Sequence, residues 1–342
     1  MLPITFVTQS LVSTLYLIPF LGIGAIAPFV FFVIILMSKA AVNVVAPAKS
    51  NWFLSLVDDR SRGNFQAKIN IVSLAGGVVF TFLASLTIDN FEAKGDLNGA
   101  FLVLTVVICI LAVLQIACLI VAREKPVDKV KGESPFKAIR SLCKNKIYVR
   151  ILIFNAIWAL ASNITTPFLS TYQIKELGFS MVFISLLTVL YSVSRALISR
   201  PLGRYADKTS FLNMLNVCYL FMAAAFAVNI FTTPENGRIM FSLYYLLYAL
   251  GCAGITNSEI NLVYESVDHE HRMGALALKS TISGLAGFAA SLLVSPLVDY
   301  IQRNGNRFLG MQVYAQQVLS AITLSIALIL LVYLNTVMRK KN

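Results

Sequence analysis

The sequence predicts an all-α protein embedded in a membrane, with about ten spanning helices. Of its 342 residues, 58% are hydrophobic and 13% are charged, and the mean hydropathy is +0.77, whereas about a quarter of a soluble domain is charged. Apolar runs of roughly 20 residues recur along the chain, which is the length that a helix needs to cross a bilayer. Polar and apolar residues do not alternate in these runs, so a transmembrane barrel is excluded.

A hydropathy window of about 19 residues places the spans in order along the chain. They cover residues 4–24, 28–48, 68–88, 100–121, 149–169, 181–199, 211–231, 239–259, 280–299 and 312–336. The longest connection follows the fourth span, and it is charged and holds two prolines. It predicts an N-terminal bundle of four helices (1–122), a cytoplasmic central loop (123–148) and a C-terminal bundle of six helices (149–342).

Basic residues segregate to one side of the expected membrane. Counted over alternate connections, 21 lysines and arginines fall on one side and five on the other. The positive-inside rule places the richer side, and with it both termini, in the cytoplasm beneath a cell membrane. The basic stretch 123–150 is therefore interpreted as a topology determinant and linker rather than a nucleic-acid or lipid-binding patch, and nucleic acid is not expected as a partner.

Motifs for enzymes and cofactors are missing from the sequence. It contains no GxxxxGK[ST] loop, no Ser/His/Asp constellation and no HExxH. The five cysteines are scattered, and His269 and His271 share one loop without a further ligand beside them, so neither a metal nor another cofactor is expected. The expected partners are the lipid bilayer and a small-molecule solute, and the chain is not expected to be an enzyme.

Two expected cytoplasmic loops resemble each other. One reads "VDDRSRGNFQAKINIVSLAG" from Val57, and the other reads "VDHEHRMGALALKSTISGLAG" from Val267. The offset is 210 residues and becomes 211 after one insertion. Similar loops at similar places in two bundles indicate a duplicated half.

The stretch "GRYADK" carries a family resemblance. Its Gly203, Asp207 and Lys208 match the GxxxD[RK] core of the cytoplasmic loop signature of the major facilitator superfamily, although residues 210–212 depart from that pattern. Together with the helix count, the central loop and the repeat, the chain resembles a member of this family. The resemblance implies two bundles and a secondary transporter that moves a small solute by alternating access, coupled to a proton or sodium gradient.

The repeat also bears on the N-terminal bundle. Subtracting 210 from Gly203 places the matching first-half loop about seven residues before Met1. The ten spans then correspond to helices three to twelve of the family pattern, and the chain is expected to lack the first two. A non-transporting remnant or a receptor-like membrane protein therefore stays open as the alternative function.

The resemblance implies that the spans 28–48, 149–169 and 239–259 line the central cavity. The candidate substrate-binding residues on these spans are Lys39, Asn43, Asn155, Trp158, Asn163, Tyr244 and Tyr248. An ionisable side chain within a span is a functional hypothesis by default, so Lys39 predicts an anionic solute. A structural role for Lys39 beside a carboxylate, and packing roles for the asparagines and tyrosines, remain open.

The candidate gating residues lie near the expected cytoplasmic ends of spans. The family's second-half loop packs near the start of the fifth helix, which implies a contact between Asp207 and Arg62. Through the repeat, Glu259 corresponds to Lys49, and this pair of opposite charge predicts an inner salt bridge, with surface positions for both as the alternative. The whole set is Gly203, Asp207, Lys208, Arg62, Lys49 and Glu259.

Overall fold

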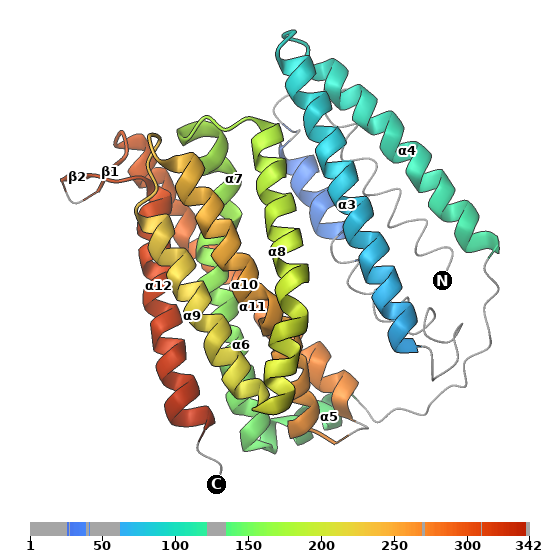
Figure 1. Cartoon of the computed structure of the whole chain (residues 1–342), viewed down its shortest axis with the longest axis vertical. Helices are drawn as coiled ribbons and strands as arrows, with labels where there is room; N and C mark the ends of the chain where they lie inside the picture. Colours follow the sequence, from blue (N-terminus) through green and yellow to red (C-terminus); the bar gives the residue numbers. More distant parts are fainter. Residues whose placement is uncertain are drawn as a thin grey trace. The chain divides into compact units, whose positions relative to one another are not determined.

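The structure is a computed structural model, and nearly all of the residues that it describes are helical (Figure 1). It describes residues 26, 28–38, 41, 62–121, 135–268, 271–308 and 310–339. The prediction of an all-α fold is confirmed. The chain divides into two compact units, Met1–Val130 and Lys131–Asn342.

In the N-terminal unit, a helical hairpin covers the expected spans 68–88 and 100–121. It consists of α3 (Arg62–Glu92) and α4 (Leu97–Val121), which pack against each other. Gly95 turns the chain between them with a φ of 72°, and Asp96 Oδ1 accepts a hydrogen bond of 2.9 Å from Gly99 N at the start of α4. A shorter helix, Pro28–Ser38, precedes the hairpin in sequence. The expected span 4–24 lies outside the described residues.

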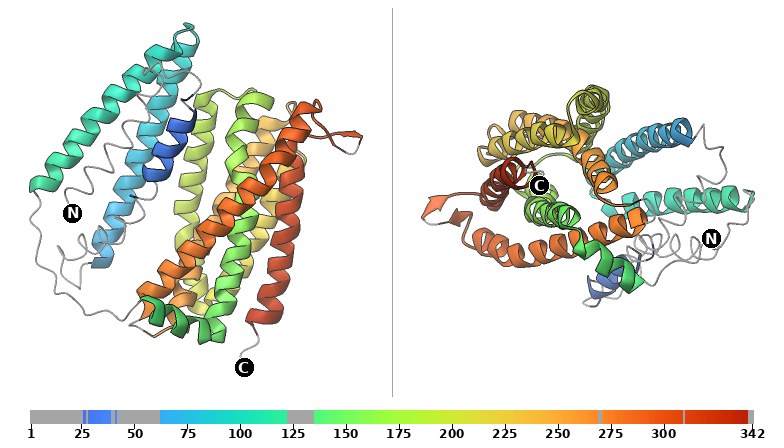
Figure 2. Two further views of the ribbon diagram at one scale, coloured as in Figure 1. Left: turned by 180° about the vertical axis from the view of Figure 1, so that it is seen from behind. Right: turned by 90° about the horizontal axis from the view of Figure 1, so that it is seen from below.

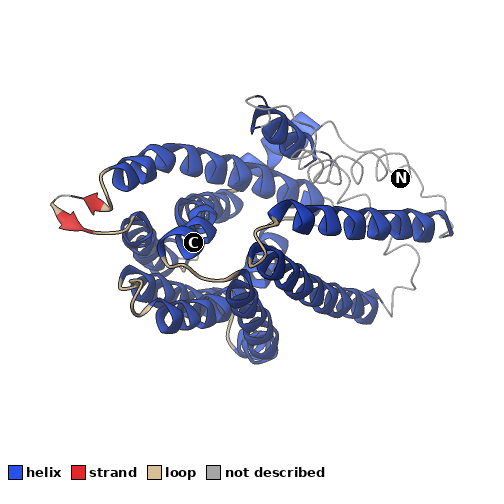
Figure 3. Cartoon of the chain, turned by 90° about the horizontal axis from the view of Figure 1, so that it is seen from above, coloured by secondary structure: helices blue, strands red, loops and turns tan. Residues whose placement is uncertain are grey.

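The C-terminal unit consists of long helices joined by short connections (Figure 2). The helices are α5 (Pro135–Lys144), α6 (Lys146–Thr165), α7 (Leu169–Thr171), α8 (Met181–Lys208), α9 (Phe211–Ile230), α10 (Gly237–Ser266), α11 (Arg272–Arg303) and α12 (Ala315–Tyr333), with the single turns η3 (Thr166–Phe168), η4 (Tyr172–Glu176) and η6 (Leu334–Met338). A small antiparallel hairpin, β1 (Arg307–Phe308) and β2 (Met311–Gln312), joins α11 to α12 (Figure 3). It is made of the only strands in the described part of the chain.

Seven helices among the described residues are long and apolar enough to cross a membrane. They are Leu97–Cys118, Lys146–Glu176, Met181–Lys208, Phe211–Ile230, Gly237–Ser266, Gly274–Arg303 and Ala315–Met338. The span that begins at Lys146 runs through α6 and continues past Pro167, which lies in the turn η3. The prediction of a helical membrane protein is therefore confirmed.

Close packing inside the C-terminal unit depends on glycines of α10. This helix packs on α8 and α9, while α6 packs on α11 and α12. A Cβ atom added to Gly251 would lie 2.8 Å from Met222 Cγ and 3.0 Å from the backbone oxygen of Cys218, and one added to Gly254 would lie 2.5 Å from Cys218 Sγ. Only residues without a side chain fit here, so these glycines set the distance between α9 and α10.

Two segments that the hydropathy window placed in connections between spans are helical in the structure, which corrects the sequence interpretation. Because α8 continues to Lys208, the "GRYADK" stretch forms its last turns, and only Thr209 and Ser210 separate it from α9. Ser210 Oγ caps α9 by accepting a hydrogen bond of 3.1 Å from Asn213 N. Likewise, α11 begins at Arg272, well before residue 280. A hydropathy window detects only the part of a helix that crosses the hydrocarbon, and these helices continue beyond it.

The expected central loop, 123–148, contains the helix α5 and the start of α6. The helix α5 begins with a proline, which suits a first helical turn, and it packs against α6 and α11 within the C-terminal unit. Asn145 separates the two helices. Its Oδ1 accepts hydrogen bonds from the backbone of Ile147 (3.0 Å) and Tyr148 (3.1 Å), and its Nδ2 donates to the oxygen of Ser266 at 2.6 Å. The asparagine thus fixes the start of α6 to the end of α10.

Candidate functional site

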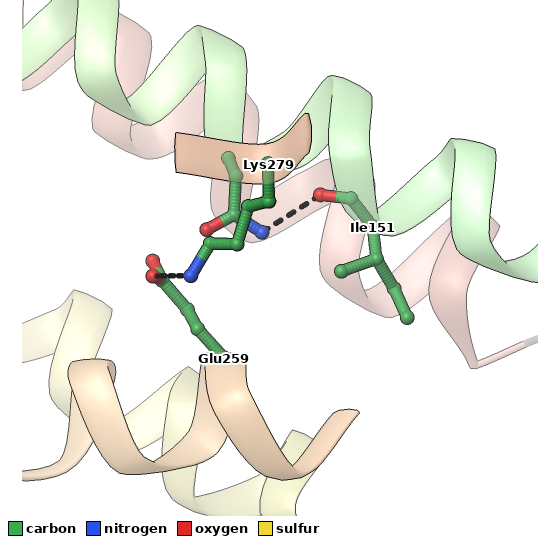
Figure 4. A network of polar contacts seen from close by, with 4 residues as sticks. Ile151, Glu259 and Lys279 are labelled. Atoms are coloured by element: carbon green, nitrogen blue, oxygen red, sulfur yellow. Dashed lines mark hydrogen bonds and ion pairs between the residues drawn. The ribbon is translucent and has the colours of Figure 1, made fainter. Parts of the chain in front are cut away.

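An ion pair lies inside the C-terminal unit, between two spanning helices. Lys279 Nζ of α11 lies 2.5 Å from Glu259 Oε2 of α10, and the two side chains are 13% and 12% exposed (Figure 4). Each residue lies about two turns from the helix end that faces the short connection between α10 and α11. Residues equally far from such a connection meet across a helical hairpin, which explains why these two side chains pair.

The helix α6 places an amide side chain in the same region. Asn155 is 3% exposed, and its Nδ2 donates a hydrogen bond of 2.8 Å to the carbonyl oxygen of Ile151, which Figure 4 shows beside the ion pair. One helical turn further along α6 lies Trp158, whose ring meets the ring of Tyr219 edge to face at 4.8 Å. Polar and aromatic groups of α6 therefore border the region of the ion pair.

A second polar group joins α8 to α10. Arg195 is half-buried in the middle of α8, and its Nη1 donates a hydrogen bond of 3.2 Å to the hydroxyl of Tyr191. The ring of Tyr191 lies 6.0 Å from the ring of Tyr248 on α10. Cys252 lies one turn beyond Tyr248 on α10. A guanidinium and two tyrosine side chains thus lie together on two spanning helices.

Several buried hydroxyls near these groups have no hydrogen-bond partner among the described residues. They belong to Tyr219, Tyr244 and Ser258. Tyr244 is 1% exposed, and its ring stacks on Tyr248 at 5.5 Å and meets Phe226 at 5.9 Å. An unsatisfied buried polar group costs about 1–3 kcal/mol. Such groups mark places where water or a polar group of a solute can bind.

The predicted substrate residues separate into three groups. Asn155, Trp158 and Tyr248 border the polar groups just described, and Tyr244 belongs to the aromatic core beside them. Asn163 instead lies at the contact of α6 with α11, where its Nδ2 donates to Ala159 O and its side chain would touch any Cβ added to Gly287. Lys39 and Asn43 lie outside the described residues.

The predicted gating residues also differ in outcome. Gly203, Asp207 and Lys208 occupy the last turns of α8, and the side chains of Asp207 and Lys208 are exposed there. Arg62 is the first residue of α3, but its side chain is not described, so its pairing with Asp207 stays a prediction.

The partner of Glu259 among the described residues is Lys279, and the expected pair with Lys49 stays a prediction. Lys49 lies outside the described residues, and the buried position of Glu259 differs from the surface position held open as the alternative.

Two candidate residues were missed by the sequence interpretation. Arg195 and Lys279 were counted with the basic residues of the cytoplasmic connections, whereas both lie within spanning helices. The signal for Arg195 was present, since it lies inside the expected span 181–199, after Ser194 and before the apolar pair Ala196 and Leu197. A charge inside an expected span indicates a functional position.

The sequence matches the family model described as the Major Facilitator Superfamily over residues 1–291. No curated protein sequence matches the chain significantly. Among solved structures, the chain is similar to a mutant form of the nucleoside transporter NupG, with a TM-score of 0.75, 16% identity, and coverage of 99% of this chain and 83% of that one.

Two further solved structures share the fold. One is a bacterial homologue of the human lysosomal transporter Spinster in an inward-facing, unoccupied conformation, with a TM-score of 0.68 and 14% identity over 97% of this chain and 82% of that one. The other is a mutant form of the E. coli fucose:proton symporter FucP, with a TM-score of 0.57 and 11% identity over 100% of this chain and 84% of that one.

Proposed function

Because the chain belongs to the Major Facilitator Superfamily, a family of membrane transporters rather than enzymes, we propose that it moves a small anionic solute across a cell membrane by alternating access. The observation that carries this proposal is the position of Arg195, a half-buried cation in the middle of α8 among the aromatic hydroxyls of α8 and α10.

The chemistry of Arg195 supports an anion. Its hydrogen bond among the described residues goes to the neutral hydroxyl of Tyr191 rather than to a carboxylate. A charge within a membrane needs compensation, and a guanidinium presents planar donors that fit a carboxylate or phosphate. A bound anion would supply the counter-charge, and the hydroxyls of Tyr191 and Tyr248 would supply further hydrogen bonds. Lys39 and Asn43 stay candidates from the sequence for binding an anion.

The Glu259–Lys279 pair supports coupling to protons. Protonation of Glu259 would remove the negative partner of Lys279 and weaken a contact that holds α10 to α11. The relatives that share the fold include a protein described as a fucose:proton symporter. We therefore assign Glu259 as the proton site and its ion pair with Lys279 as a contact that changes during transport. Both chain ends are assigned to the cytoplasm by the excess of basic residues on that side.

The test is a flux assay with the purified full chain in proteoliposomes. A panel of radiolabelled solutes separates the classes: lactate, succinate and glycerol 3-phosphate as anions, and uridine and fucose as neutral solutes. We expect uptake of at least one anion, driven by a pH gradient and not by a sodium gradient. Arg195→Gln should reduce that uptake at least tenfold, because a charge-assisted hydrogen bond contributes about 1.5–3 kcal/mol.

Arg200→Gln is the matched control, since Arg200 lies on the same helix with an exposed side chain. It should leave uptake unchanged. Uptake of neutral solutes alone, with Arg195→Gln fully active, would show that the solute class is wrong. Absence of flux for every solute, from protein that is folded and inserted, would favour the non-transporting alternative.

A further inference from the structure

A cavity of about 550 Å³ opens at the end of the C-terminal unit where α6 and α9 begin and α10 ends. The last turn of the described chain, η6, forms another wall through Met338 and the adjoining Arg339. The cavity is separate from the polar groups around Arg195, and none of the residues assigned to transport lines it. The charged and apolar residues that line it indicate a ligand different from the transported solute.

The charged side chains around the cavity favour an anion. Lys146, Arg150 and Arg339 line it, against a single carboxylate, Glu265. The two arginines are held in place by neutral groups: Arg150 Nη1 donates to the oxygen of Val337 at 3.5 Å, and Arg339 Nη2 donates to Asn213 Oδ1 at 2.5 Å. These contacts orient both guanidinium groups at the cavity, and the partner of Arg339 is a neutral amide.

Helix ends of both polarities meet at the cavity. The first residue of α6 and the capping residue of α9, Ser210, both line it. The N-terminus of a helix carries roughly half a positive charge, which stabilises an anion nearby. The C-terminal ends of α10 and η6 also line the cavity and carry the opposite partial charge. The excess of three basic side chains over one carboxylate therefore favours an anion.

The remaining walls of the cavity are apolar. Ile151, Leu212, Leu262 and Met338 contribute them, and Ile147, 61% exposed, continues the apolar surface outside. A small inorganic anion gains nothing from such walls, whereas an amphiphile with a charged head places its acyl chain along them. These helices cross the membrane, so the available amphiphile is lipid.

We propose that this basic cavity binds the phosphate head group of an anionic phospholipid. Lys146, Arg150 and Arg339 contact the phosphate, and the acyl chain leaves the cavity past Ile147. The head group then links the start of α6 to the end of α10 and to η6. The C-terminal part of the basic stretch 123–150 therefore has a binding role in addition to its effect on topology.

The experiment measures binding of dioleoyl phosphatidylglycerol and dioleoyl phosphatidylcholine to the purified full chain by native mass spectrometry. We expect the chain to retain phosphatidylglycerol in preference to phosphatidylcholine. The double variant Lys146→Gln/Arg339→Gln should lower phosphatidylglycerol affinity about 30-fold, because two cations near the head group are lost. Both side chains are exposed, so the unfolding temperature without lipid should be unchanged.

The control variant is Arg200→Gln/Arg204→Gln, which removes two exposed cations of α8 that do not line the cavity. It should keep the wild-type affinity. A second variant, Leu212→Trp, fills the cavity with its charges intact and should also weaken phosphatidylglycerol binding.

Three results would overturn the proposal. The first is equal affinity for the two lipids, and the second is equal loss of affinity in the control variant. The third is competition by inorganic phosphate: if millimolar phosphate displaces the lipid from the wild-type chain, the cavity is a site for free anions. Phosphate without effect, together with the losses expected for the cavity variants, supports a lipid site.

Discussion

At the scale of single residues, the Glu259–Lys279 pair combines two charges that a membrane protein can keep buried only together. Each side chain is almost fully enclosed between α10 and α11. Removing one partner leaves the other charge without compensation, which is far less favourable than removing both. The effect of one substitution alone therefore overstates what the pair contributes to the free energy of unfolding. The interaction between the two residues is measured by the coupling free energy of the two substitutions.

We expect Glu259→Gln and Lys279→Gln each to destabilise the folded chain by about 3–5 kcal/mol, and the double variant to lose much less than the sum of the two. Thermal unfolding of the detergent-purified variants gives the comparison. The exposed pair Asp299–Arg303, at 2.9 Å on α11, is the matched control. Its double-mutant cycle should give a coupling below about 1 kcal/mol, since exposed pairs contribute little. Strict additivity at Glu259 and Lys279 would argue against their direct contact.

At the scale of helices, the contact of α9 with α10 depends on glycines that no motif of the sequence singles out. A methyl group at Gly251 would overlap Met222 and approach the backbone of α9, which cannot move aside as a side chain can. The two small residues of α10 thus determine how closely the aromatic core around Tyr219 and Tyr244 closes.

Gly251→Ala should destabilise the protein by about 1–3 kcal/mol, the usual effect of overpacking a tight interior. Gly274→Ala on α11 is the control, because a Cβ there meets Leu142 at an ordinary distance of 4.0 Å. That change should be neutral or stabilising by up to about 1 kcal/mol, since alanine favours the helix. Equal effects of the two substitutions on the unfolding temperature would show that α9 and α10 do not pack this closely.

The accuracy with which the sequence predicts the ends of a helix also differs between helices. Spans such as 211–231 were predictable because their whole length lies in hydrocarbon, and the structure has α9 at Phe211–Ile230. The ends of α8 and α11 were not, because they carry charges like those of a loop while continuing as helix. The helix α5 was hidden for the same reason. Hydropathy reports the surroundings of a residue more directly than its backbone conformation.

The prediction of the candidate site is limited in the same way, because hydropathy does not show where a helix begins. Glu259 was predictable because a carboxylate within a span is rare, but its partner depends on where α11 begins. With residue 280 taken as the start of that span, Lys279 was assigned to a connection. Conversely, Asn163 was predictable as polar but not as a packing residue, because its role depends on the facing glycine at position 287.

At the scale of the whole molecule, the orientation in the membrane that we propose from the basic residues can be tested directly. Cys143 of α5 is exposed on the side assigned to the cytoplasm, and Lys94 and Arg238 are exposed on the other side. We expect an impermeant maleimide to label the variants Lys94→Cys and Arg238→Cys in intact cells. Cys143 should react only after the cells are permeabilised. Labelling of Cys143 in intact cells would reverse the assigned topology.

The pairing of charges across the α10–α11 hairpin has a consequence for synthesis. A charge at the centre of a helix raises the free energy of entering the bilayer from the translocon by about 2.5–3.5 kcal/mol, and a charge two turns from the helix end raises it by less. The charge of α10 is negative, and the next helix to leave the ribosome carries its positive partner. If the two helices enter the bilayer together, their charges pair and most of this free-energy cost is removed. Insertion of α10 is therefore more favourable after α11 has reached the translocon. The hairpin is then the unit of insertion, and the yield of the single charge variants in the membrane, compared with that of the double variant, reports on this step as well as on folding.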